Sequence, residues 1–222
     1  MVENQAFLLS DFESDTVSLE SAAGSKRLPP RACSNRVRKK CNTIQQAIAE
    51  TVEKNFCRRM TLGQACRDGR KDCVRKLLRG NLTNLNTLDA DGFSPLHYAT
   101  TTNHVDIVQM LLDAGADVDV RGSPSIQRIP PIICAAKFNA IESCRVLLRA
   151  GADVNITNCY GQTALHHATR RGHSKMVELL LRDGQMDVNV VDRDNTTSLH
   201  VAAMIGSNPI IKTLVITPMN VL

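Results

Sequence analysis

The sequence repeats itself with a period of about 34 residues, and this period constrains the fold more than any other feature. Three stretches are variants of one pattern: DGFSPLHYA at 91–99, YGQTALHHA at 160–168 and DNTTSLHVA at 194–202. Aliphatic residues occupy one register in five successive units, at intervals of 34, 36, 33 and 34 residues: Leu62, Leu96, Ile132, Leu165 and Leu199. A fixed period of roughly 20 to 50 residues is typical of stacked repeat architectures.

Two further markers run in phase with the first. Aliphatic pairs recur at 77–78, 111–112, 147–148, 180–181 and 214–215. The stretch AGADV occurs at 114–118 and 150–154, and DGQMDV at 183–188 resembles it. Three markers that agree in phase indicate one structural unit repeated five times.

The unit at 88–120 shows what each repeat should form. Asp91-Gly92 predicts a turn. Ser94-Pro95 predicts the start of a short helix, because proline lacks the backbone N–H that would have no partner at that position. A wider apolar stripe after Val105 predicts a second helix, which Gly115 ends. Such a unit has too little apolar area to fold alone, so stacking must stabilise it.

Composition predicts which residues form the core and the redox state of the cysteines. The chain has 43% apolar residues but five Phe, two Tyr and no Trp, which predicts a core of Leu, Ile, Val and Ala. Eight cysteines without a C-x-x-C pair favour reduced thiols over disulfides or zinc ligands. No run of about 18 apolar residues predicts a membrane span.

The repeats resemble the ankyrin repeat family. The resemblance rests on the stretches at 61–80, 91–120, 130–156, 160–190 and 194–215. It implies an all-α ankyrin-repeat solenoid of stacked helix–turn–helix units with projecting β-turn fingers. The expected repeats cover 57–216, divided as 57–87, 88–120, 121–156, 157–190 and 191–216.

Three histidines occupy one register: His97, His166 and His200. In ankyrin repeats this histidine hydrogen-bonds the backbone at the start of the first helix, and the resemblance implies the same role here. Successive repeats hold the rings roughly 10 Å apart, too far for one metal ion. The sequence also lacks a glycine-rich phosphate loop, G-x-S-x-G and H-E-x-x-H. We expect no enzyme activity, no catalytic or metal-binding residues and no cofactor.

The resemblance also implies where a protein partner binds, since ankyrin stacks use their turn tips and the exposed side of the first helices, which line a concave groove. The equivalent residues here include cations and aromatics, which suit an acidic or mixed apolar peptide; the alternative is an ordinary solvated surface. The expected partner-binding residues are Asp91, Phe93, Tyr98, Thr101, Lys137, Phe138, Tyr160, Gln162, His167, Arg170, Arg171, Asp194 and Met204.

The third repeat departs from the pattern. It has RGSPSIQRIPPI at 121–132, is three residues longer, lacks the turn glycine, and has Ile133 in place of the histidine. We expect its finger to project or flex and the helix start to use other partners. The insertion is either a binding element or tolerated drift.

The segment before the repeats has a different composition. Residues 1–25 carry five acids and no Lys or Arg, and residues 26–40 carry seven bases and no acid, which predicts disorder over 1–41. Ile44, Ile48, Val52 and Phe56 predict an amphipathic helix over 42–56 that caps the first repeat. The basic clusters resemble a bipartite nuclear import signal, against the alternative of a solvated charge run. The import residues are Lys26, Arg27, Arg38, Lys39 and Lys40.

The end of the chain and two asparagines complete the expectations. Pro218 ends the last helix, so residues 217–222 form a truncated or irregular tail. Ile210, Ile211, Leu214 and Ile216 should be partly exposed, which makes 194–222 the least stable part and suggests a truncated product or a piece of a longer array. The spacing L-x5-D-V-N makes Asn155 and Asn189 candidates for the asparaginyl hydroxylation found in many ankyrin proteins.

The favoured function is a non-enzymatic adaptor, scaffold or inhibitor that binds a protein partner in the concave groove. One alternative is a regulatory or targeting fragment of a larger enzyme or ubiquitin-ligase subunit, and another is a nuclear transcriptional regulator. Direct nucleic-acid binding is disfavoured, because the basic run lacks interleaved aromatics and the net charge of +5 is modest. We expect a cytoplasmic and also nuclear monomer, unless the apolar C-terminal end pairs with a second copy.

Overall fold

The structure, a computed structural model, describes residues 60–80, 84–183 and 186–216. The chain divides into two units, residues 1–50 and 51–222, and every described residue belongs to the second unit. The predictions for segment 1–41, the helix at 42–56 and the tail at 217–222 lie outside the described residues.

Short helices joined by turns make up the described residues, which contain no strand. A turn of 3-10 helix, η1 (Pro124–Ile126), lies in the connection before α6. The α-helices are α2 (Leu62–Arg67), α3 (Lys71–Arg79), α4 (Pro95–Thr101), α5 (Val105–Asp113), α6 (Pro131–Phe138), α7 (Ile141–Arg149), α8 (Ala164–Arg170), α9 (Ser174–Asp183), α10 (Ser198–Met204) and α11 (Asn208–Ile216).

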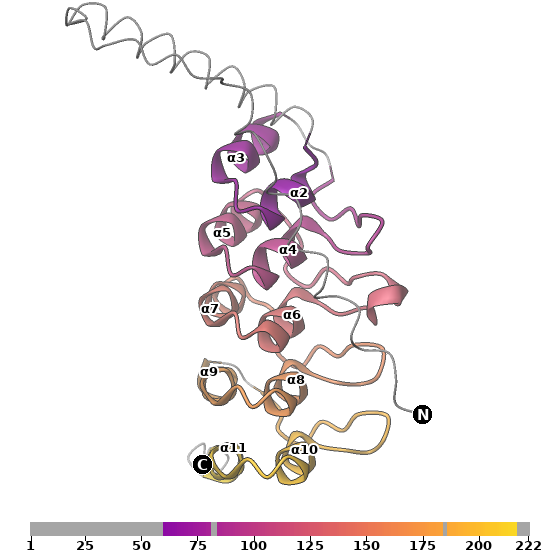
Figure 1. The fold of residues 1–222 in the computed structure, drawn as a ribbon, viewed down its shortest axis with the longest axis vertical. Helices are drawn as coiled ribbons and strands as arrows, with labels where there is room; N and C mark the ends of the chain where they lie inside the picture. Colours follow the sequence, from indigo (N-terminus) through magenta and orange to yellow (C-terminus); the bar gives the residue numbers. More distant parts are fainter. Residues whose placement is uncertain (1–59, 81–83, 184–185, 217–222) are drawn as a thin grey trace, which may run out of the picture. The chain divides into compact units, whose positions relative to one another are not determined.

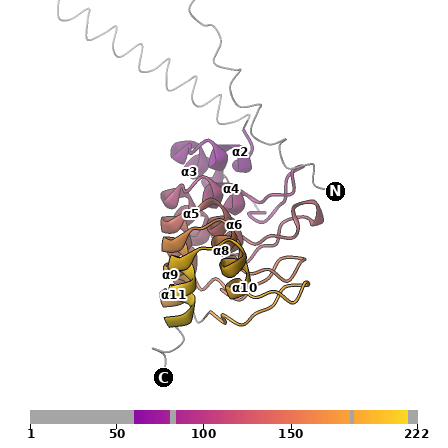
Figure 2. The ribbon, with the colours of Figure 1, turned by 60° about the horizontal axis from the view of Figure 1, so that its bottom comes forward.

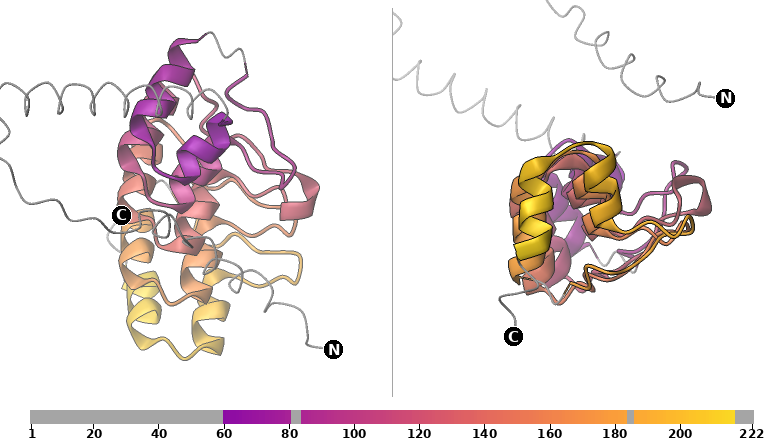
Figure 3. Two further views of the ribbon diagram at one scale, coloured as in Figure 1. Left: turned by 45° about the horizontal axis from the view of Figure 1, so that its top comes forward. Right: turned by 90° about the horizontal axis from the view of Figure 1, so that it is seen from below.

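The helices form two layers (Figure 1). In one layer the first helix of each repeat packs on the next, in the order α2, α4, α6, α8 and α10; in the other, the second helices follow in the order α3, α5, α7, α9 and α11. We call these the inner and outer helices. Figure 2 shows the fingers, which are the connections before α4, α6, α8 and α10, projecting beside the inner helices. The view along the stack in Figure 3 superposes successive repeats. The predicted all-α solenoid of helix–turn–helix units with projecting fingers is therefore confirmed.

One aliphatic residue per inner helix forms the centre of the core. Leu96 and Ile132 are fully buried and Leu165 is 1% exposed, whereas Leu199 in the last repeat is 42% exposed. The inner helices of Leu96, Ile132 and Leu165 each pack on the inner helix of the following repeat, whereas no described repeat follows Leu199. Since full burial of a Leu or Ile side chain contributes about 1.5–3 kcal/mol, stacking supplies stability that an isolated unit lacks.

The capping histidines have the predicted structural role. In α4, Ser94 donates its backbone N–H to Nδ1 of His97 at 3.1 Å, and the Ser94 hydroxyl accepts the N–H of His97 in return. Nε2 of His97 then donates to the Ile129 carbonyl of the next repeat at 2.7 Å. His166 bonds Thr163 and the Thr196 carbonyl in the same way. One imidazole therefore caps its own helix and joins it to the next repeat.

The third repeat begins its helix without a side-chain cap. Pro130 is the N-cap residue and Pro131 follows it, so two of the backbone N–H groups that a helix start leaves open are absent. Ile133 is fully buried in place of the histidine. The finger contains η1 and two residues with positive φ, Gln127 at 64° and Arg128 at 51°. We expected this helix start to use other hydrogen-bond partners; instead it has no side-chain cap, and the two prolines leave fewer N–H groups that need a partner.

Hydrogen bonds attach the third finger to its neighbours. The Ser123 N–H donates to the Gly92 carbonyl at 3.0 Å, and the Cys159 N–H donates to the Gln127 carbonyl at 3.0 Å. The Arg193 N–H continues the series to the Tyr160 carbonyl at 2.9 Å. The longer finger is therefore part of one bonded row.

Two further expectations need correction. Cys66, Cys134 and Cys159 carry free thiols, but Cys73 is disulfide-bonded, so the expectation of reduced thiols is wrong at that position. In the last repeat, Ile210 and Leu214 are buried, not partly exposed, because their four-residue spacing places both on the side of α11 that packs on α9 and α10.

Candidate protein-binding surface

The ends of the inner helices form a continuous exposed face, which we call the inner-helix surface. Two residues in each of the second to fifth repeats occupy equivalent positions there, because the repeat spacing places them one above another. They are Thr101 and Thr102, Lys137 and Phe138, Arg170 and Arg171, and Met204 and Ile205. Phe138 is 52% and Met204 83% exposed, so large apolar side chains are open to solvent on this face. The predicted partner-binding residues at the ends of the inner helices all lie on this surface: Thr101, Lys137, Phe138, Arg170, Arg171 and Met204.

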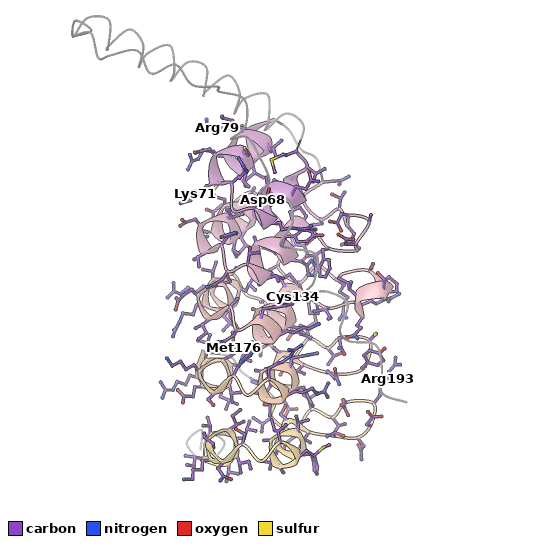
Figure 4. All side chains as sticks on the ribbon, in the orientation of Figure 1. Asp68, Lys71, Arg79, Cys134, Met176 and Arg193 are labelled. Carbon is purple, nitrogen blue, oxygen red and sulfur yellow. The ribbon has the colours of Figure 1, made fainter. Side chains whose placement is uncertain are left out.

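The fingers border this surface. Asp91, Tyr160 and Asp194 lie at equivalent turn positions and are exposed. The guanidinium carbon of Arg193 lies 5.8 Å from the centroid of the Tyr160 ring, within cation–π range. Figure 4 shows Arg193 out along the fingers, away from the outer helices.

Tyr98 is buried by its neighbours and offers little surface to a partner. The Arg67 guanidinium stacks 4.1 Å from its ring centroid, and its hydroxyl donates to Asp89 at 2.5 Å and to Asp91 at 3.3 Å. Burial and the Asp89 bond raise the pKa of Tyr98 well above its usual range. Phe93, half-buried, packs against the Tyr98 ring at a centroid distance of 5.4 Å. This cluster joins the first two repeats.

Gln162 and His167 are also buried, contrary to the expectation of a finger tip and an exposed helix position. Asn158 shapes the finger by accepting the backbone N–H groups of Tyr160 and Gln162. With its oxygen turned towards Arg170, the Gln162 carboxamide accepts two hydrogen bonds from the guanidinium at 3.0 and 3.3 Å. Burial lowers the pKa of His167 to about 4, and the charges of Arg170 and Lys137 add to the effect. His167 is thus neutral at pH 7.

The surface is divided by charge. In the second repeat Asp89 and Asp91 are bonded to Tyr98, and Arg67 pairs with Asp91 at 3.3 Å. In the third and fourth repeats the exposed positions hold Lys137, Arg170 and Arg171, which we call the basic sector, with Phe138 beside them. The fifth repeat has Met204 and Ile205. The charged groups of the second finger are therefore bonded to one another and to Arg67, whereas the third and fourth repeats present cations and the fifth presents apolar side chains.

Asn155 has a structural role in a second bonded row. Its side-chain oxygen accepts the Asp187 N–H of the next repeat at 2.8 Å, as Asn86 and Asp119 do for the repeats that follow them. Asn155 is half-buried and Asn189 is exposed. Whether either is hydroxylated stays a prediction.

Neither of two cavities among the described residues is lined by a predicted partner-binding residue. One cavity of the described residues lies between the helix turns at Gly69 and His104, and another lies between α7 and α9 near Ile141 and Leu179. Among the residues that the structure describes, no group of His, Cys, Asp and Glu could hold a metal ion. No helix in this part of the chain is long and apolar enough to cross a membrane.

Sequence reasoning missed several residues of this surface. Thr102 and Ile205 share the register of Phe138 and Arg171, so the repeat spacing alone could have identified them. Arg193 was missed because its contact with Tyr160 is made between two neighbouring fingers, and the sequence of one finger does not show such a contact. The import residues Lys26, Arg27, Arg38, Lys39 and Lys40 lie outside the described residues.

Comparison with known proteins agrees with the geometry. A family model described as "Ankyrin repeats (3 copies)" matches residues 31–122 and 132–221. The human (Homo sapiens) B-cell lymphoma 3 protein is 38% identical over 141 residues, covering 62% of this chain and 30% of that protein. Ankyrin repeat and SOCS box protein 3 of Bos taurus is 35% identical over 147 residues, covering 65% and 27%.

A third relative is NF-kappa-B inhibitor alpha of Sus scrofa, which is 32% identical over 119 residues, covering 52% of this chain and 38% of that protein. The matched part thus spans less than two fifths of each of these three relatives. Together with the stacked helix pairs and the matched residues, these likenesses place the chain in a known group: it belongs to the ankyrin repeat family.

Proposed function

We propose that the chain is a non-enzymatic adaptor or inhibitor that binds a partner protein across the inner-helix surface and fingers. Ankyrin repeats are generally non-catalytic modules for protein–protein interaction, and repeat stacks present extended binding faces. The observation that carries the proposal is the basic sector, where three exposed or half-exposed cations lie beside the exposed Phe138 ring. Charged groups with an aromatic neighbour suit an acidic segment that also carries apolar residues.

Charge reversal tests this proposal. In the variant Arg170→Glu/Arg171→Glu, a partner recovered with the wild-type chain from cells should be lost. The matched control is Lys76→Glu/Arg79→Glu on α3, which makes the same change in net charge; Figure 4 shows Arg79 on the outer-helix side. Circular dichroism checks that both variants fold. Equal recovery of the partner by all three proteins contradicts the proposal.

Two alternatives have support of their own. The matched relatives are much longer than the aligned segment, which favours a regulatory or targeting part of a larger protein. The name of one relative, an inhibitor of NF-kappa-B, and the basic clusters in the N-terminal segment favour a nuclear transcriptional regulator. Assembly of the chain with a catalytic subunit, or with a transcription factor, would decide between them.

Nuclear import and asparaginyl hydroxylation remain proposals. A bulky fluorescent fusion should accumulate in nuclei, and replacing Arg38, Lys39 and Lys40 by Ala should move it to the cytoplasm. The same distribution for both proteins removes the import proposal.

Mass spectrometry of the intact protein from normoxic cells tests the hydroxylation proposal. Absence of added oxygen at Asn155 and Asn189 removes it.

A further inference from the structure

The last helix pair, α10 and α11, has one side that no described helix covers, which we call the end face. Its residues occupy the positions that each earlier repeat packs against the repeat that follows it. They are Leu199, His200 and Ala203 of α10, and Ile211 and Val215 of α11. The right-hand view of Figure 3 looks onto this end of the stack, with the last repeat in yellow. The end face therefore continues an interface that the stack already uses at each internal junction.

The equivalent residues one repeat earlier are buried. Leu165 and His166 are each 1% exposed at the junction with the last repeat. In the last repeat, Leu199 is 42% exposed and Val215 is 45% exposed, and the His200 ring is exposed as well. The position of Leu199 is buried in each of the four preceding repeats. An aliphatic surface that is covered at every internal junction is thus open at this end, as in surfaces that bind another molecule.

Two polar groups at this end lack the partners that their equivalents have. In the preceding repeat, Nε2 of His166 donates to a carbonyl of the last repeat, and the Asn155 side chain accepts a backbone N–H of the repeat that follows it. His200 accepts the Thr197 N–H at Nδ1, so its proton is on Nε2. Among the described residues, neither Nε2 of His200 nor the side-chain oxygen of Asn189 has such a partner. The end of the stack therefore carries one unused donor and one unused acceptor.

The charges of the last helix pair do not oppose contact with a like surface. α10 and α11 contain one charged residue, Lys212, and no acidic residue. The positions equivalent to Lys212 are exposed inside the stack: Gln109, Arg145 and Glu178. Lys212 therefore lies beside the end face and not on it. Since a terminal repeat that faces water normally has a polar outer side, an aliphatic and uncharged end indicates that a second surface covers it.

We propose that two copies of the chain pair through their end faces in a closed dimer with twofold symmetry. The end face suits a copy of itself, because aliphatic side chains meet aliphatic side chains and each unused donor faces an unused acceptor of the other copy. A charged partner would find no opposite charge here. Like faces close at two copies, whereas pairing of opposite ends would form open filaments.

Sedimentation of the purified full chain tests the pairing. Over about 1–100 μM we expect the mass to rise from that of one chain towards that of two. Leu199→Glu should weaken dimerisation by about tenfold or more, because it buries an unpaired charge. The matched control is Met204→Glu, which makes the same charge change on the same helix at a side chain that is 83% exposed on the inner-helix surface. This control should dimerise as the wild type does.

Circular dichroism checks that both variants fold. A wild-type chain that stays monomeric over the whole concentration range overturns the proposal. Equal dimerisation of the Leu199→Glu and Met204→Glu variants also overturns it, because the contact would then lie elsewhere.

A photo-crosslinking amino acid at Val215 identifies what covers the end face. Peptides from the product with the mass of two chains should join position 215 to α10 or α11 of the other copy. A cross-link to α2 or α3 would mean head-to-tail pairing and contradict twofold symmetry. In cells, a cross-link to a different protein without one to a second copy assigns the end face to that protein, and the dimer is then wrong.

Hydrogen exchange gives an independent readout. In dilute solution the chain is monomeric, and its open end leaves the amides at 200–216 weakly protected. Raising the concentration should slow their exchange and leave the amides of α4 and α5 unchanged. The Leu199→Glu variant should show no such dependence. Exchange at 200–216 that is the same at all concentrations contradicts the dimer.

Discussion

At the residue scale, His97 joins two repeats through a single ring. Its imidazole is buried, which lowers its pKa from 6.5 to about 4, and both ring nitrogens are hydrogen-bonded. The folded state therefore binds fewer protons than the unfolded state between these values. Stability is complete above pH 6.5 and falls as the pH is lowered towards 4, with a contribution from His97 of up to about 3 kcal/mol.

Urea unfolding across this pH range checks the effect. His97→Gln should be less stable than the wild type at pH 7 and should lose less stability on acidification. His166 is also buried with a lowered pKa, so it adds to the wild-type dependence in the same direction. A flat stability profile from neutral pH down to about 4 contradicts this account.

Asn155 and Asn189 provide a matched pair at the same scale. Asn155 accepts a backbone N–H of the next repeat at 2.8 Å, whereas Asn189 is exposed at the end of the fourth repeat. Asn155→Ala should cost about 1 kcal/mol of unfolding free energy, and Asn189→Ala should change it by less than about 0.5 kcal/mol. Denaturant unfolding measures both. Equal losses would mean that the bonded row does not support stability.

At the element scale, two glycines test how closely the fingers pack. Gly161 and Gly151 both have positive φ, at 77° and 87°, so alanine costs about 1 kcal/mol or more at either position. A Cβ at position 161 would lie 3.3 Å from Cα of Asp192 in the next finger, whereas at position 151 it would meet nothing within 4 Å. Gly161→Ala should therefore be the more destabilising. The reverse order in thermal unfolding contradicts close packing of the fourth and fifth fingers.

The elements also show what the sequence could and could not predict. Helix pairs and the buried ladder of Leu96, Ile132 and Leu165 followed from periodicity, because each repeat buries the same face against the next. The burial of Tyr98 did not, since Arg67 from the preceding repeat covers its ring. The burial of His167 could not be predicted either. It depends on contacts between the inner helix and the finger, which the repeat spacing does not specify.

At the scale of the whole molecule, the last repeat should be the least protected part of the described stack. Leu199 is 42% exposed and Val215 is 45% exposed, whereas the equivalent Leu165 of α8 is 1% exposed and the equivalent Leu181 of α9 is half-buried. In the monomer, amides at 200–216 should exchange faster than those at 164–181. Hydrogen exchange detected by NMR checks this, and equal or slower exchange at 200–216 contradicts it.

The central claim is that a partner protein lies on the inner-helix surface at α6 and α8. A photo-crosslinking amino acid at Phe138 or Arg171 probes that surface directly, and the same group at Lys76 or Arg79 on α3 probes an exposed outer helix. In cells, we expect a partner cross-linked from Phe138 and Arg171 and absent from Lys76 and Arg79. A partner that cross-links only from the α3 positions would contradict the claim.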